Sequence, residues 1–200
     1  MSETRELEQI YKKAHALASE DLYDEENAFL REALRKYPDD PELLVRMGAS
    51  DMTTDPERAK DCLRRAYSLS PDDPWRVARC AILMADLSEF GDAERFARRA
   101  QELAPTDFVF EPDISYVLGR AAYSRHQYAE ARSLLTAAFE GEPAVPEHAE
   151  WLAHFYYTAE DDAVTALKVL AQGLLHRPAD RRLTTLRDQI LAYVRSSTES

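Results

Sequence analysis

The sequence predicts an all-α protein, a solenoid of about five helical hairpins followed by a C-terminal capping helix. Two observations carry this prediction, the period of its prolines and the small residues that precede them. Five prolines recur along the 200-residue chain at spacings of 33, 34, 38 and 35 residues, and each lies five positions after a small residue. A period of this length indicates repeated units that bury their apolar sides against one another. The five prolines are Pro38, Pro71, Pro105, Pro143 and Pro178.

The second helix of each unit is predicted from small residues on one face. In four of the five units another small residue lies seven positions before the first, with an apolar residue between them. Spacings of three, four and seven place side chains on one face of a helix, so a neighbouring helix can approach this face closely. Glu26 takes the place of a small residue in the first unit. The small residues are Ala59, Ala93, Ala131 and Ala166 at the first position, and Ala33, Ala66, Ala100, Ala138 and Gly173 at the second.

The first helix of each later unit is marked by a proline at its start, in the strings DDPE, DDPW, FEPD and AVPE. Proline suits the first helical position because its missing N–H has no partner within the helix there. Asp40 and Asp73 precede such prolines and are placed to cap the helix, and Asp55 repeats the signal before a second helix. All ten prolines therefore mark helix ends, and none interrupts a predicted helix.

We expect one repeat domain over residues 1–195. Its units cover approximately residues 5–38, 39–71, 72–105, 106–143 and 144–178. A helix over 180–195 follows, because the last hairpin needs a cap for its apolar side. Residues 196–200, with the sequence SSTES, are predicted to be disordered.

The pattern resembles the tetratricopeptide repeat (TPR) family, whose 34-residue unit carries small residues at positions 8, 20 and 27 and proline at position 32. Met47-Gly48, Cys80-Ala81 and Leu118-Gly119 match positions 7 and 8 of that unit. The resemblance covers about residues 5–178. It implies a right-handed superhelix whose first helices line a concave, peptide-binding groove.

The net charge of −12, from 25 basic and 37 acidic residues, disfavours nucleic acid and membrane surfaces as partners. The chain shows neither a signal-peptide core at its start nor an apolar run approaching the ~20 residues of a membrane span, so we expect a cytoplasmic protein. Cys62 and Cys80 are predicted to be reduced core thiols. The preference for arginine over lysine suggests a GC-rich bacterial genome.

The sequence contains no recognisable catalytic motif, and we expect neither an enzyme nor a cofactor. Glu150 and His154 lie four positions apart on a predicted helix, with His148 nearby. This spacing suits metal ligands, but a zinc site needs three or four convergent ligands. A metal-dependent enzyme is therefore a remote alternative.

The TPR resemblance implies a set of peptide-binding residues on the first helix of each unit. The fifth unit can be aligned in two ways, which place either His154 and Tyr157 or Trp151 and Phe155 in the groove. The predicted peptide-binding residues are Tyr11, His15, Met52, Trp75, Arg79, Ile82, Tyr116, Arg120, Tyr123, His154 and Tyr157.

These residues favour a non-catalytic scaffold, an adaptor or chaperone-like module that holds a protein or peptide, because aromatic and arginine side chains dominate binding hot spots. A structural component that self-associates into a homo-oligomer is the alternative. The apolar loop residues Phe108, Val109 and Phe110 either fill a gap between units or stay exposed for a partner.

Overall fold

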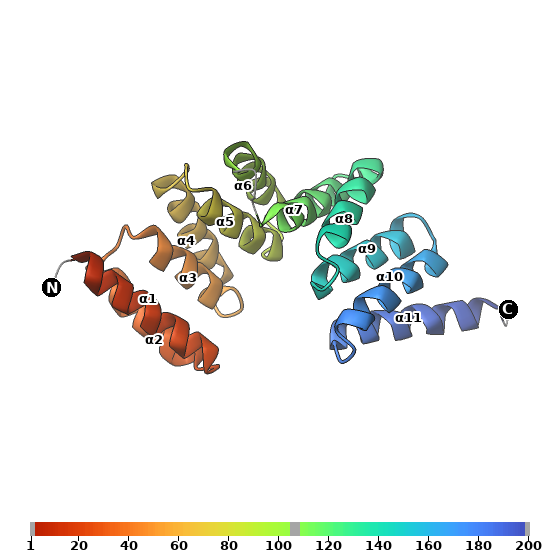
Figure 1. The fold of residues 1–200 in the computed structure, drawn as a ribbon, viewed down its shortest axis with the longest axis horizontal. Coiled ribbons are helices and arrows are strands. Elements are labelled where there is room, and N and C mark those ends of the chain that lie inside the picture. The colour runs from red at the N-terminus through yellow and green to blue at the C-terminus, as the bar shows by residue number, and fades with distance from the viewer. Residues whose placement is uncertain (1–2, 105–108, 199–200) are drawn as a thin grey trace. The chain divides into compact units, whose positions relative to one another are not determined.

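A computed structural model describes residues 3–104 and 109–198, and in these ranges all of its regular secondary structure is α-helix (Figure 1). The helices form two compact units, Met1–Ala104 (unit 1) and Pro105–Ser200 (unit 2). The boundary falls where the sequence predicts the junction of the third and fourth hairpins. The expected all-α architecture of stacked helical hairpins is confirmed.

Unit 1 is built from three helical hairpins in which consecutive helices pack against each other. The hairpins are α1 (Glu3–Ser19) with α2 (Tyr23–Lys36), α3 (Pro41–Asp51) with α4 (Pro56–Leu69), and α5 (Pro74–Asp86) with α6 (Phe90–Leu103).

Unit 2 contains two hairpins and a final helix, and α11 packs against both α9 and α10. Its helices are α7 (Glu111–Ser124), α8 (Tyr128–Gly141), α9 (Pro146–Ala159), α10 (Ala163–His176) and α11 (Arg181–Thr198). The cap helix is longer than expected, since residues 196–198, predicted to be disordered, continue α11. Residues 199 and 200 lie outside the described ranges.

The predicted caps lie at the predicted helix starts. The side chains of Asp40, Asp55 and Asp73 each accept a hydrogen bond from a backbone N–H three residues later, at 2.9, 3.2 and 3.1 Å. Such bonds satisfy donors that have no partner inside the helix. Proline follows each of these caps at the first turn.

The small residues form the contact faces between helices, as predicted. All nine are buried, and Gly48 lies so close to α4 that a Cβ atom placed there would be 2.8 Å from Cγ of Leu63. Four of the five hairpins turn through a residue with positive φ, namely Asp21, Ser88, His126 or Asp161. The second hairpin, whose first helix has only 11 residues, turns without one.

The structure also shows how far the two cysteines and the described part of the 108–110 loop are buried. Cys80 is buried, which raises the pKa of its thiol to about 12, and Cys62 is half-buried with its pKa raised by the same cause. Val109 is 67% exposed, Phe110 is half-buried beside α7, and Phe108 lies outside the described residues. None of the described helices combines the length and the apolar character that a bilayer span requires.

Candidate functional site

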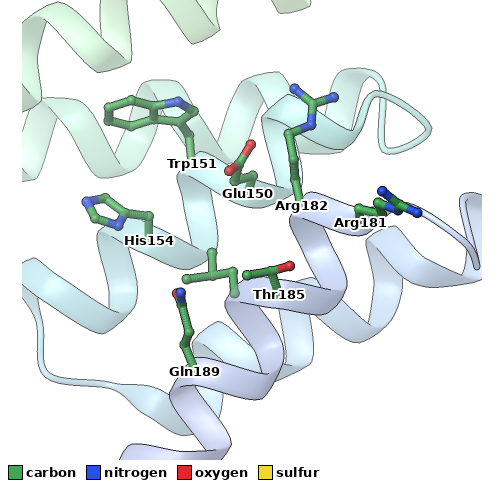
Figure 2. Close-up of a pocket in the computed structure, with 8 residues that line it drawn as sticks. Glu150, Trp151, His154, Arg181, Arg182, Thr185 and Gln189 are labelled. Carbon is green, nitrogen blue, oxygen red and sulfur yellow. The ribbon is translucent and has the colours of Figure 1, made fainter.

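Helices α9 and α11 of unit 2 enclose a pocket of about 510 Å³, called the α9/α11 pocket below (Figure 2). Figure 2 shows the aromatic side chains toward one end of the pocket and two arginines toward the other. The lining residues are Glu150, Trp151 and His154 from α9, and Arg181, Arg182, Thr185, Leu186 and Gln189 from α11.

The arginine end of the pocket is positioned by the start of α11. The Asp180 carboxylate accepts hydrogen bonds from the backbone N–H groups of Arg182 and Leu183, at 3.0 and 3.1 Å, and so caps the helix. The cap places Arg181 and Arg182 in the first helical turn. Arg182 Nη2 lies 2.5 Å from Glu147 Oε1 on α9, which ties the two helices together at this end.

Glu150 and His154 lie one turn apart on α9, and burial shifts the pKa of both. Burial raises the pKa of Glu150, an effect that the nearby Arg182 partly opposes. Burial lowers the pKa of His154. Removal from water disfavours the charged form of each group, so the pocket is a partly dehydrated site.

Trp151 is held in place by a buried arginine from α7. The guanidinium of Arg120 lies over the Trp151 ring, 4.6 Å from its centre, and over the Tyr116 ring, at 5.1 Å. Arg120 Nη1 also donates a hydrogen bond of 3.0 Å to the Tyr116 hydroxyl. A cation over the face of an aromatic ring is an attractive contact that strengthens when water is excluded.

Further aromatic contacts support the same wall of the pocket. Tyr123 on α7 makes edge contacts with Trp151, His154 and Phe155, with ring centres 5.9 to 6.1 Å apart. Its hydroxyl lies 2.9 Å from Oγ1 of Thr158. Edge-on geometry is favourable for aromatic pairs, so α7 and α9 present a packed aromatic layer to the pocket.

No protein-family model matches the sequence, and a comparison with curated proteins finds no relative. Solved structures do match its fold. PilW, described as a type IV pilus biogenesis factor, superposes with a TM-score of 0.77 and 14% identity over 100% of this chain and 91% of its own. TTC0263, a TPR protein of Thermus thermophilus, gives 0.74 and 17% over 92% and 98%. YrrB, described as a TPR protein with an unusual peptide-binding site, gives 0.57 and 18% over 88% of each chain.

The chain has the tetratricopeptide repeat fold. Identities this low establish the fold alone. Within it, the α9/α11 pocket lies between the first helix of the fifth TPR hairpin and the cap helix.

In unit 2 the structure separates the predicted TPR groove residues into two layers. Tyr116 and Arg120, expected on the groove surface, are only 4% and 6% exposed. The rings of His148 and Trp151 on α9 contact them, so both belong to the packed layer. His154 borders the pocket, and Tyr123 is half-buried behind Trp151.

The two alignments of the fifth TPR unit are both represented in the pocket. Trp151 comes from one alignment and His154 from the other, and both line the cavity. Phe155 is fully buried. Tyr157 packs edge-on against Tyr193 of α11, with ring centres 5.7 Å apart.

In unit 1 the predicted groove residues range from buried contacts to exposed rings. The Tyr11 hydroxyl donates a 2.7 Å hydrogen bond to Asp40 of the next hairpin, and burial together with that carboxylate raises the Tyr11 pKa. Arg79 Nη1 lies 3.1 Å from Glu42 Oε1. Trp75 is 42% exposed. The others are His15, which is exposed, and Met52 and Ile82, which are half-buried.

Sequence reasoning missed the α11 side of the pocket. The TPR resemblance directs attention to the repeats, and the cap helix is expected to close the stack or, in the self-associating alternative, to pair with a second copy of the chain. The available signal was the polar side of this helix, with Arg181 and Arg182 directly after the capping Asp180.

The weak metal-ligand spacing on α9 does not develop into a site in the part of the chain that the structure describes. No group of three or more His, Cys, Asp or Glu side chains converges there in a way that could hold a metal ion. His148 is buried against the Tyr116 ring, and its Nε2 lies 3.4 Å from Asp113 Oδ1. These contacts give His148 a place in the α7/α9 interface.

Proposed function

We propose that this TPR protein is a non-catalytic scaffold that binds a protein or peptide, in the manner of an adaptor or chaperone-like module. The α9/α11 pocket receives a side chain of the partner. The observation that carries this proposal is the Trp151 ring, which borders a cavity of about 510 Å³ and is fixed on one face by Arg120.

The dimensions and chemistry of the pocket suit recognition of a side chain. Binding pockets in proteins commonly have volumes of about 300–1,000 Å³ and combine apolar walls with a few polar groups. Here Trp151 and Leu186 supply apolar surface, and Thr185 and Gln189 supply polar groups. Because Trp151 is already held, a ligand loses little free energy in ordering it.

The structural neighbours support the same class of function. YrrB is described as having a peptide-binding site, although an unusual one. The fold is common to both proteins, so a peptide-binding role is consistent with the architecture. The residues that carry such a role in this chain have to come from its own surface.

Unit 1 offers a candidate contact region of its own. Trp75 is exposed at the start of α5, and Arg79 follows it one turn later on the same helix. We propose Trp75, Arg79 and the half-buried Ile82 as a separate contact region within unit 1.

The proposal is tested by selecting binders from a random peptide library displayed on phage and measuring their affinities for variants of the full chain. Trp151→Ala should weaken the selected peptides about 30-fold or more, the loss typical of a hot-spot residue. Thr185→Trp should also weaken binding strongly, because an exposed residue that lines the pocket is enlarged without a change of charge while the core is left intact. Circular dichroism spectra and melting curves establish that both variants are folded.

Tyr23→Ala is the matched control, since Tyr23 is an exposed ring on α2 outside the predicted site. Peptides that bind all three variants equally well would exclude the pocket as the binding site. Trp75→Ala is measured in the same assay, and a loss confined to this variant would move the site to unit 1.

Self-association is a second candidate function, favoured by one exposed face of α10. Val164 and Leu175 are 64% and 80% exposed, and their spacing of eleven residues places them on the same side of the helix. Light scattering at increasing concentrations tests this candidate. Oligomers that dissociate in Leu175→Glu support it, and a monomer at all concentrations rules it out.

A further inference from the structure

The net charge of the residues that line the α9/α11 pocket has the opposite sign to the net charge of the whole chain. The chain carries a net charge of −12, whereas the lining contains two arginines and one glutamate. The lining taken by itself is net positive, and such a surface favours contact with acidic groups.

The two further carboxylates beside the pocket, Glu147 and Asp180, already have partners. Glu147 pairs with one nitrogen of Arg182, and a guanidinium has five N–H donors. Asp180 is engaged as the helix cap. Glu150 is half-buried, and burial raises its pKa.

Arg181 is the cation best placed to meet a ligand. Its side chain is exposed at the arginine end of the pocket (Figure 2). Among the residues that the structure describes, no ion pair of Arg181 is found. An acidic ligand therefore gains a charge-assisted contact without displacing an existing one.

The opposite end of the pocket is suited to an aromatic or large aliphatic side chain. Trp151 and His154 lie at this end, and Leu186 forms part of the lining (Figure 2). Thr185 and Gln189 lie one turn apart on α11 along the pocket. Their hydroxyl and amide groups are placed to hydrogen-bond a peptide backbone that runs from one end to the other.

We infer that the α9/α11 pocket recognises an acidic peptide segment in which an aromatic side chain is flanked by Asp or Glu. The ring packs against Trp151 and Leu186, and the neighbouring carboxylate pairs with Arg181. This inference rests on the proposed peptide-binding function and specifies its ligand. A basic peptide is disfavoured because it brings a cation toward the two arginines of the lining.

The test uses five synthetic peptides and fluorescence anisotropy with the full chain. The first probe is acetyl-Gly-Ser-Asp-Phe-Asp-Ser-Gly-amide with a fluorophore. In three others both Asp residues are replaced by Asn, both by Lys, or the Phe by Ala. The fifth is the Asn peptide with a free carboxyl terminus, which separates a side-chain carboxylate from a terminal one.

We expect the acidic peptide to bind about three- to tenfold more tightly than the Asn peptide, a range set by a partly exposed ion pair. Arg181→Gln should remove this preference by weakening the acidic peptide more than the Asn peptide. Arg195→Gln is the matched control, because it makes the same charge change on α11 about 20 Å further along the helix. Arg195→Gln should keep the preference for the acidic peptide. Raising the salt concentration should reduce this preference.

Three results would overturn the inference. These are equal affinities for the Asp and Asn peptides, tighter binding of the Lys peptide, and tight binding only of the peptide with a free carboxyl terminus. Each leaves the proposed function intact if library-selected peptides still depend on Trp151. If no library peptide depends on the pocket, the proposed function itself fails.

Discussion

The guanidinium of Arg120 on α7 lies 4.6 Å from the centre of the Trp151 ring on α9, and Arg120 is almost completely buried. The Arg120 side chain therefore covers one face of the Trp151 indole within unit 2. The contact couples the fourth hairpin to the wall of the α9/α11 pocket, so a change on α7 reaches the site without touching a ligand.

Replacing Arg120 by methionine should loosen Trp151. The substitution keeps an apolar side chain of similar length and removes a cation–π contact of about 1–2 kcal/mol. The chain has two tryptophans, so a Trp75→Phe background isolates the emission of Trp151. We expect stronger acrylamide quenching of Trp151 and weaker peptide binding in Arg120→Met. In that background, Arg79→Met in unit 1 is the control, and equal quenching in both variants would contradict the coupling.

An ion pair between a buried carboxylate and a partly exposed arginine joins the two helices of the second hairpin. The Asp51 carboxylate at the end of α3 is 0% exposed. Arg58 of α4 donates to both of its oxygens, with Nε 2.5 Å from Oδ2, and the Asn27 amide donates to Oδ1 at 2.8 Å. These bonds join α2, α3 and α4.

The two partners of this pair should differ in the cost of their removal. Arg58→Met leaves the buried Asp51 carboxylate with the Asn27 amide alone, and we expect a loss of about 3 kcal/mol in the free energy of unfolding. Asp51→Asn should cost less, about 1–2 kcal/mol, because the Arg58 side chain is 36% exposed and lies 3.7 Å from Asp55.

Urea denaturation followed by circular dichroism measures both losses. Arg35→Met, which removes an exposed pair with Glu32, should change stability by less than about 1 kcal/mol. A larger loss of unfolding free energy for Asp51→Asn than for Arg58→Met would show that the buried Asp51 carboxylate does not need Arg58 as a partner.

Glu26 occupies a position where the other hairpins have alanine, and it is 7% exposed. Burial raises its pKa above the ordinary 4.5, and Arg46 partly offsets the effect. A folded-state pKa above the unfolded one adds stability that is fully present at low pH and is lost as the pH rises through the folded value.

Glu26→Gln should therefore be more stable than the wild type at neutral pH. The difference should shrink as the pH falls below the raised pKa, where Glu26 is protonated. Melting temperatures at several pH values measure it. Glu32→Gln, on the exposed side of the same helix, should show no such pH-dependent difference, and a pH-independent effect of Glu26→Gln would exclude the charge as its cause.

The hairpins were predictable from the sequence because their determinants are local. A proline after a capping aspartate fixes a helix start, as at Asp40, and the alanine spacing fixes the packed face. The burial of Arg120 was not predictable, since the ring that covers it lies in the following hairpin. The arginines of the pocket were visible in the sequence, but the position of α11 against α9 depends on packing along the whole helix.

Gly48 and Gly91 should respond in opposite directions to the same substitution. Gly48 lies inside α3 and Gly91 in the first turn of α6. Alanine is favoured over glycine by about 1 kcal/mol in a helix interior, which is an upper bound for Gly91. A Cβ atom at Gly48 would lie 2.8 and 2.9 Å from two carbons of the buried Leu63, whereas at Gly91 it would meet no atom within 4 Å.

Gly91→Ala should therefore stabilise the protein by up to about 1 kcal/mol, and Gly48→Ala should destabilise it through overpacking, typically by about 1–3 kcal/mol. Because both changes restrict the unfolded chain alike, the difference between their unfolding free energies in urea isolates the packing cost at Leu63. Adding Leu63→Ala should make room for the new methyl group and remove most of the penalty of Gly48→Ala. An unchanged penalty in that double variant, measured against Leu63→Ala alone, would show that the Ala59 carbonyl oxygen, 3.3 Å from the same Cβ position, sets the limit.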